Sequence, residues 1–208
     1  MGPNPYTPPG APHAMNIVVP AGARRGALPS RALLVSKLVL GSAAMALVSV
    51  AVILVGVGVV LGRQAGKSLL DLGVGLALLG ELFALPWAIT WLVAIYRFWS
   101  WFPPEHRYTG LWRRYISPAA AAWFMLVPFF GFFWMFVIYL GAGEVLSRLR
   151  ITYPTKKAPS SGLALATLLI GFVFTPAFPI LDFLFDRQTE GLAREIEAQL
   201  VRADEARR

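Results

Sequence analysis

Residues 38–62 form an apolar run without Asp, Glu, Lys or Arg, and this run limits the possible folds more than any other feature of the sequence. As a helix it would be about 37 Å long, which suffices to cross a bilayer core of about 30 Å with some tilt. Three more apolar segments of similar length follow at 72–96, 118–143 and 162–185. We therefore predict an all-α integral membrane protein with four transmembrane helices within residues 32–186.

The composition also favours a membrane protein. Of the 208 residues, 57% are hydrophobic and 14% are charged, whereas charged residues make up about a quarter of an ordinary soluble domain. The sequence has no Cys, which excludes disulfides, thiolate metal ligands and Cys nucleophiles.

The second predicted span contains Glu81, an ionisable side chain well inside an apolar segment. About a dozen apolar residues at roughly −0.3 to −0.6 kcal/mol each outweigh one acid at roughly +3 kcal/mol, so the span still inserts. Because acids within a membrane are costly, Glu81 is the candidate functional residue there. The alternative is a structural role, in which a protonated Glu81 donates a hydrogen bond to Ser49, Thr167 or Thr175.

Proline interrupts the third and fourth predicted spans. Pro128 lies within 118–143, and Pro176 and Pro179 lie within 162–185. Each proline removes a helical hydrogen bond, so we expect these two spans to be kinked or broken.

The two ends of the chain differ from the spans in composition. Residues 1–31 are rich in Pro and Gly, which predicts a disordered arm. Residues 187–208 are charged, and within them Leu192, Ile196 and Leu200 lie four residues apart. This spacing predicts a short amphipathic C-terminal helix, which we expect to be exposed.

The distribution of positive charge predicts the orientation of the spans. If the N-terminus is cytoplasmic, most of the 19 Lys and Arg residues fall in cytoplasmic segments, as the positive-inside rule requires. The outer loops then hold Arg63, Lys67, Arg148, Arg150, Lys156 and Lys157. We therefore predict a multi-pass protein of the bacterial inner membrane with both termini in the cytoplasm.

The segment between the second and third spans mixes aromatic and basic side chains. Its candidate lipid-interface residues are Arg97, Trp99, Trp101, Arg107, Trp112, Arg113 and Arg114. Such side chains favour the headgroup layer, where cations meet anionic lipid. The net charge of +8 would also suit a nucleic acid, but these aromatic residues adjoin apolar spans, so we expect no nucleic-acid partner.

The sequence contains no catalytic or metal-binding motif that we recognise. GxSxG and HExxH patterns are absent, and the glycines of the segment from Gly62 to Ser68 are one residue too close for a phosphate-binding P-loop. The two histidines, His13 and His106, have no evident metal partner, and the adjacent Glu105 and His106 fit a solvated pair better than a proton-transfer pair. We expect no enzymatic activity, no cofactor and no metal.

Small residues recur at helical spacing along the second span, at Gly73, Ala77, Gly80 and Ala84. Such a stripe lets another helix approach closely. We expect it to serve packing among the predicted spans, and self-association is the alternative.

Residues 96–150 contain the motifs Ser117-Pro118, Leu126-Val127-Pro128-Phe129-Phe130, Phe133-Trp134 and Gly141-Ala142-Gly143. In these motifs the segment resembles a family of bacterial inner-membrane domains of unknown function. That family often has Asn where this chain has Gly131. The resemblance implies a bacterial membrane location and four spans, and it implies no catalytic residues.

Together these features predict a non-enzymatic membrane anchor or interaction protein. Its expected partners are anionic lipid headgroups and a partner protein or a second copy of the chain. The alternative is a small oligomeric channel or transporter that uses Glu81 and the proline-broken spans, because broken helices recur at transport sites.

Overall fold

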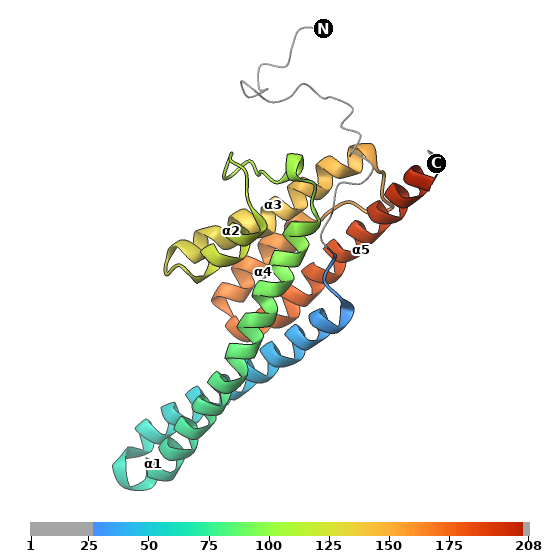
Figure 1. Ribbon diagram of the computed structural model, residues 1–208. Coiled ribbons are helices and arrows are strands. Elements are labelled where there is room, and N and C mark those ends of the chain that lie inside the picture. Colours follow the sequence, from blue (N-terminus) through green and yellow to red (C-terminus); the bar gives the residue numbers. More distant parts are fainter. Residues whose placement is uncertain (1–26, 206–208) are drawn as a thin grey trace.

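The computed structural model describes residues 27–205, and its regular elements over this range are all helical (Figure 1). They are α1 (Arg31–Trp101), η1 (Pro104–His106), α2 (Pro118–Trp123), η2 (Phe124–Leu126), α3 (Phe130–Thr152), α4 (Ser161–Val173), η3 (Thr175–Ala177) and α5 (Phe178–Glu205). The segments long and apolar enough to cross a membrane are Arg31–Gly62 and Gly66–Trp101, both in α1, and Phe130–Thr152. The all-helical prediction is confirmed, whereas four spans are not. Residues 1–26 of the predicted arm lie outside the described range.

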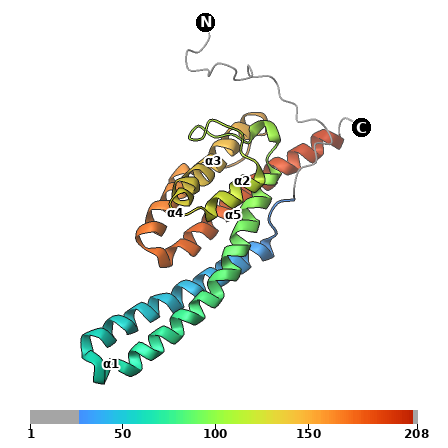
Figure 2. The same cartoon turned by 60° about the vertical axis from the view of Figure 1, so that its left-hand side comes forward.

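Helix α1 is a hairpin of two antiparallel limbs that meet at Gly62 (Figures 1 and 2). Gly62 has a φ of 80°, a left-handed conformation that glycine adopts without steric cost. The non-helical backbone angles within α1 are those of Gly62, so the second limb accommodates Pro86 without a break. The two limbs contain the predicted spans 38–62 and 72–96.

Glycines allow the two limbs of α1 to approach closely. A Cβ atom on Gly73 would lie 2.8 Å from Cγ2 of Val55, and one on Gly80 would lie 2.8 Å from Cγ2 of Val48. Both distances are shorter than an ordinary carbon contact of about 3.5–4.0 Å. The small-residue stripe of the second limb therefore faces the first limb.

Helices α2 and α3 form a second hairpin from the residues of the third predicted span (Figure 1). The chain reverses at 127–129, and the indole of Trp134 on α3 donates to the carbonyl oxygen of Ala121 on α2 at 3.1 Å. The sequence predicts a kink or a break at Pro128, and the structure has a break with a chain reversal there and no kink. Gly131 makes the turn possible, because a Cβ there would lie 2.6 Å from the carbonyl oxygen of Met125.

Helices α4 and α5 form a third hairpin from the residues of the fourth predicted span. Here the chain reverses at η3, which contains Pro176. The Thr167 hydroxyl on α4 donates to the carbonyl oxygen of Leu181 on α5 at 3.3 Å and so links the two helices. Residues 162–185 are therefore two antiparallel helical segments and not one kinked helix.

Helix α5 continues to Glu205 through the segment expected to be a short exposed helix. Its apolar residues Leu192, Ile196 and Leu200 are buried, and they belong to the same core as residues of α3. The expectation of an exposed tail is therefore wrong, because the apolar stripe that defines the amphipathic helix has a partner surface within the chain.

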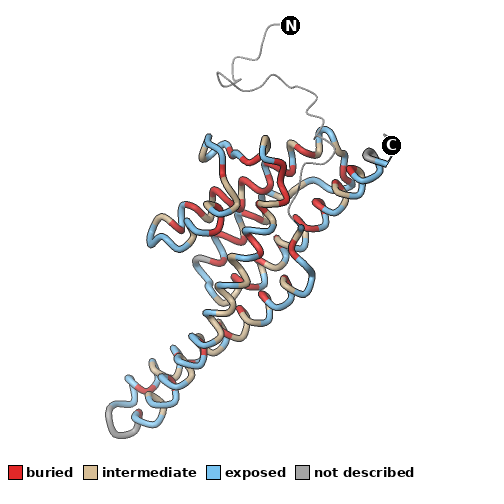
Figure 3. Tube along the Cα trace, in the orientation of Figure 1, coloured by how far each residue is buried: buried red, intermediate tan, exposed pale blue. Residues whose placement is uncertain are grey.

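The three chain reversals point toward the same end of the molecule (Figures 1 and 2). The hairpin of α1 extends well beyond the other two, while the segments 102–117 and 153–160 lie at the opposite end with the end of α5. Buried residues concentrate where the helices meet, and exposed residues follow the outer part of the α1 hairpin (Figure 3). The molecule thus consists of a helical body and one long projecting hairpin.

Replacing Gly73 by Leu should destabilise the α1 hairpin, because the new side chain would overlap Val55 on the other limb. We expect the free energy of unfolding to fall by about 1–3 kcal/mol, measured by denaturing the purified protein in detergent. The matched control is Gly75→Leu on the same limb, because nothing lies within 4 Å of a Cβ at Gly75. Equal stability of the two variants would contradict this close packing.

Candidate functional site

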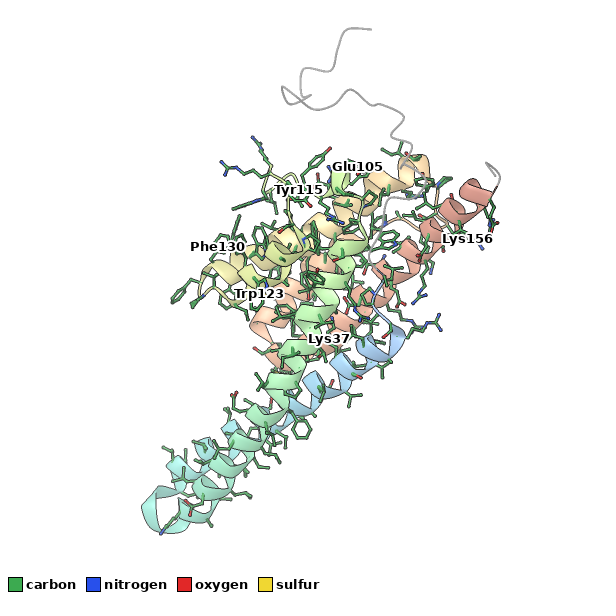
Figure 4. The ribbon with its side chains drawn as sticks, viewed as in Figure 1. Lys37, Glu105, Tyr115, Trp123, Phe130 and Lys156 are labelled. Carbon is green, nitrogen blue, oxygen red and sulfur yellow. The ribbon has the colours of Figure 1, made fainter. Side chains whose placement is uncertain are left out.

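Lys37, Asp182 and Asp186 form an ion cluster between the first limb of α1 and helix α5, in which Lys37 and Asp182 are buried and Asp186 is partly exposed. The Nζ atom of Lys37 lies 2.8 Å from Oδ2 of Asp182 and also pairs with Asp186. Lys37 is 1% exposed and Asp182 is 0% exposed. Figure 4 places Lys37 where the first limb joins the body. Mutual pairing offsets the cost of removing these charges from water.

Two hydrogen bonds extend this ion cluster to other helical segments. The hydroxyl of Tyr139 on α3 donates to Oδ1 of Asp182. The indole Nε1 of Trp91, on the second limb of α1, donates to the hydroxyl of Tyr139 at 3.0 Å. The ion cluster and these bonds therefore join α5, α3 and both limbs of α1.

Local sequence explains how the cluster is positioned. Asp182 and Asp186 are four residues apart on α5, so their side chains lie on one face of the helix. One turn before Asp182, the ring of Phe178 packs edge-on against Trp87 and Trp91, with centroid distances of 6.2 and 6.3 Å. These ring contacts join α5, one turn from Asp182, to the second limb of α1.

The electrostatics of the cluster centre on Asp186. Burial raises the pKa of its carboxyl group to about 7, while Lys37 opposes and Asp182 adds to this rise. When Asp186 is protonated, Lys37 and Asp182 balance each other's charge. A cavity of about 30 Å³ adjoins Asp186, Tyr139 and Glu190, with room for about one water molecule.

The described part of the chain, 27–205, contains no group of three or more His, Cys, Asp or Glu side chains that could hold a metal ion. Lys37 pairs with both acidic side chains of the cluster.

Glu81 lies outside this cluster, on the outer face of the second limb of α1. Its neighbours on that face, Leu78 and Leu85, are 68% and 67% exposed. Within residues 27–205 the Glu81 carboxylate makes no hydrogen bond or ion pair. The hydroxyls of Ser49 and Thr167, two of the suggested partners, donate to backbone carbonyls. Glu81 is therefore a lone acid on an apolar surface.

Three of the predicted lipid-interface residues lie inside the protein. Trp99 and Trp101 are 0% and 1% exposed. Arg107 is also buried, and its guanidinium donates to the carbonyl oxygens of Phe102 and Ser100, each at 2.8 Å. Enclosed side chains cannot reach lipid headgroups, which corrects the prediction at these three positions. The physical reason is that the segment folds back on the end of α1 as a compact loop.

The other members of that set lie nearer the surface. Arg97, Arg113 and Arg114 are exposed and stay candidates for lipid contact. Trp112 is half-buried, with its ring 5.0 Å from that of Trp134. Of the seven predicted residues, the exposed ones are therefore three arginines, whereas all three tryptophans are buried or half-buried.

Sequence reasoning missed the ion cluster. Lys37 stands one residue before the first predicted span and Asp182 lies near the end of the fourth, where each could be expected to reach water. The reversal at η3 instead returns Asp182 to the level of Lys37. The sequence feature that could have indicated the cluster is a lysine beside one apolar run together with two acids four residues apart at the end of another apolar run.

Comparisons with known proteins give no match: no family model, no curated protein and no solved structure is significantly similar to this chain. The site is therefore interpreted from its own geometry.

Replacing Lys37 by Met should leave the buried carboxylate of Asp182 and the partly exposed carboxylate of Asp186 without their cation. We expect the free energy of unfolding to fall by about 3–5 kcal/mol, as when one partner of a buried pair is removed. The measurement is denaturation of the purified protein in detergent. Lys67→Met is the matched control, because Lys67 is exposed near the tip of α1. If both variants unfold alike, the cluster does not join the helices as described.

Proposed function

We propose that this chain is a non-enzymatic, multi-pass protein of the bacterial inner membrane that acts as a membrane anchor and interaction component. The observation that carries this proposal is the outer surface of the α1 hairpin. Val60, Leu78 and Leu82 are 85%, 68% and 69% exposed, while the inner surface is closed by glycine packing between the limbs. An apolar surface of this extent needs lipid or another protein to cover it.

The length of the hairpin supports two crossings of the membrane. The first limb has 32 residues, and at about 1.5 Å per residue it measures about 48 Å. A bilayer with its headgroups is about 40–45 Å thick. Charged Lys67 and Asp71 at the tip then lie in the far headgroup layer. Trp87 and Trp91 lie near the other interface, where tryptophan is enriched.

The tips of the two shorter hairpins support partial insertion from the near side. Phe129 at the first tip is 91% exposed, and Val173 and Phe174 at the second are 85% and 61% exposed. An apolar groove of about 280 Å³ lies between these hairpins, lined by residues such as Phe132 and Leu168. In the proposed arrangement both tips enter the near leaflet and return, and two crossings replace the four that the sequence predicts.

The charge distribution supports the proposed orientation. The segments 102–117 and 153–160 lie at the end of the molecule opposite the hairpin tip, and Figure 4 labels Glu105 and Lys156 there. All positive residues of these segments then lie on the same side as the C-terminal half of α5, and Arg63 and Lys67 belong to the tip. Under the positive-inside rule this side is cytoplasmic.

Glu81 supports an interaction role in addition to anchoring. In the proposed arrangement this acid faces the hydrocarbon core, where a charged side chain costs about 3 kcal/mol on the insertion scale. Contact with a partner helix, or a second copy of the chain, would reduce that cost by supplying a hydrogen-bond donor or acceptor. In the alternative function, a small oligomeric transporter, Glu81 would lie at the same kind of contact. Measurements of ion flux therefore distinguish the transporter from the anchor.

Single-cysteine labelling tests the membrane arrangement, because the chain has no native Cys. In intact cells, an impermeant maleimide should label Ser68→Cys at the hairpin tip and should not label Lys156→Cys until the cells are permeabilised. Both positions are exposed. Labelling of Lys156→Cys in intact cells would contradict the two-crossing arrangement and favour four spans. Protection of Ser68→Cys under the same conditions would contradict a hairpin that crosses the membrane.

Proton and cation flux into reconstituted vesicles tests the non-transport function. We expect the wild-type protein and Glu81→Gln to give the same flux as empty vesicles. Thermal stability should change little, because Glu81 has no partner within residues 27–205. Asp71→Asn, another exposed acid of the same limb, is the matched control. A wild-type flux that is lost in Glu81→Gln and kept in Asp71→Asn would contradict the anchor proposal and support the transporter.

A further inference from the structure

A groove with a basic rim lies between the start of α1 and helix α5. Arg31 is the first residue of α1, and Arg187 and Arg194 lie two turns apart on α5. Together with Val35 and Phe183 they line a space of about 400 Å³. Side chains that are far apart in sequence therefore converge on one groove of mixed basic and apolar character.

The groove carries positive charge that the protein does not neutralise. Glu190, its acidic member, is 7% exposed, and its carboxylate accepts a hydrogen bond from Nε of Arg194 at 2.7 Å. The neighbouring Asp186 pairs with Lys37 in the ion cluster. Within residues 27–205, the guanidinium groups of Arg31 and Arg187 make no hydrogen bond or ion pair. Two exposed guanidinium groups are thus free to bind an anion.

The apolar part of the groove lies on the side of the membrane. Val35 is one helical turn from Arg31 toward the tip of α1, and Phe183 is one turn from Arg187 toward η3. Because the first limb is about 48 Å long, Arg31 lies at the near headgroup layer when the tip of α1 reaches the far one. Basic groups at headgroup depth with apolar groups directly below them match the two parts of a phospholipid.

We infer that this groove is a binding site for an anionic phospholipid of the cytoplasmic leaflet. Arg31 and Arg187 bind the phosphate, because guanidinium groups donate paired hydrogen bonds to its oxygens. One acyl chain lies along Val35 and Phe183. This inference rests on the proposed membrane arrangement, which brings the groove to the headgroup layer.

The exposed arginines of the loop 102–117 offer a contrast. Arg113 and Arg114 are exposed, like Arg31 and Arg187, yet they do not line the grooves described above. These two arginines supply positive charge, but they do not adjoin a groove with an apolar lining. A variant of these two residues therefore removes the same charge and leaves the groove intact.

The test is lipid binding by the full chain in detergent, followed as the rise in thermal stability on titration with phosphatidylglycerol. We expect saturable stabilisation of the wild type, with an apparent affinity at least tenfold weaker in Arg31→Gln/Arg187→Gln. Arg113→Gln/Arg114→Gln should bind as the wild type does. Phosphatidylcholine with the same acyl chains, and inorganic phosphate, should each give little stabilisation.

Three results would overturn the inference. An unchanged affinity in Arg31→Gln/Arg187→Gln, or an equal loss in the loop variant, would remove the groove as the site. If inorganic phosphate saturated the rise in thermal stability at the same concentration as the lipid, the ligand of the groove would be a soluble anion and not a phospholipid. Membrane residence is checked separately by carbonate extraction. If the variants and wild type stay in the membrane but the affinities do not differ, the lipid site fails and the anchor proposal stands.

Discussion

The pairing of Lys37 with Asp182 and Asp186 is the interaction on which the arrangement of the helices depends. Lys37 belongs to the long α1 hairpin, whereas both carboxylates belong to α5. Tyr139 and Trp91 extend the same set of contacts to α3 and to the second limb of α1. Because charges at this depth cannot be left without partners, the helices that supply them are held in one relative position. The position of the body on the projecting hairpin follows from that requirement.

The sequence predicts the helical segments better than their connections. The two limbs of α1 could be predicted because each is an apolar run bounded by charged or small residues. Pro128 and Pro176 correctly indicate where the later helices stop, but a proline does not determine the direction in which the chain continues. That direction depends on contacts such as the one between Trp134 and Ala121, which link residues on different helices.

The candidate site was harder to predict because burial is a property of the folded chain. Trp99 and Arg107 look like interfacial residues, since aromatic and basic side chains alternate around them. In the structure the backbone carbonyls of Ser100 and Phe102, at the end of α1, accept hydrogen bonds from the guanidinium of Arg107, so a charged residue is enclosed without an acidic partner. For the acidic residues Glu81 and Asp182, the position in the sequence suggests the wrong degree of burial. The acid in the middle of an apolar run is exposed, and the acid near the end of one is buried.

The unequal lengths of the three hairpins give the molecule different widths along its long axis (Figures 1 and 2). In the proposed orientation, two helices alone occupy the outer leaflet, while the inner leaflet accommodates those helices together with the tips of the other two hairpins. The protein therefore displaces more lipid from one monolayer than from the other.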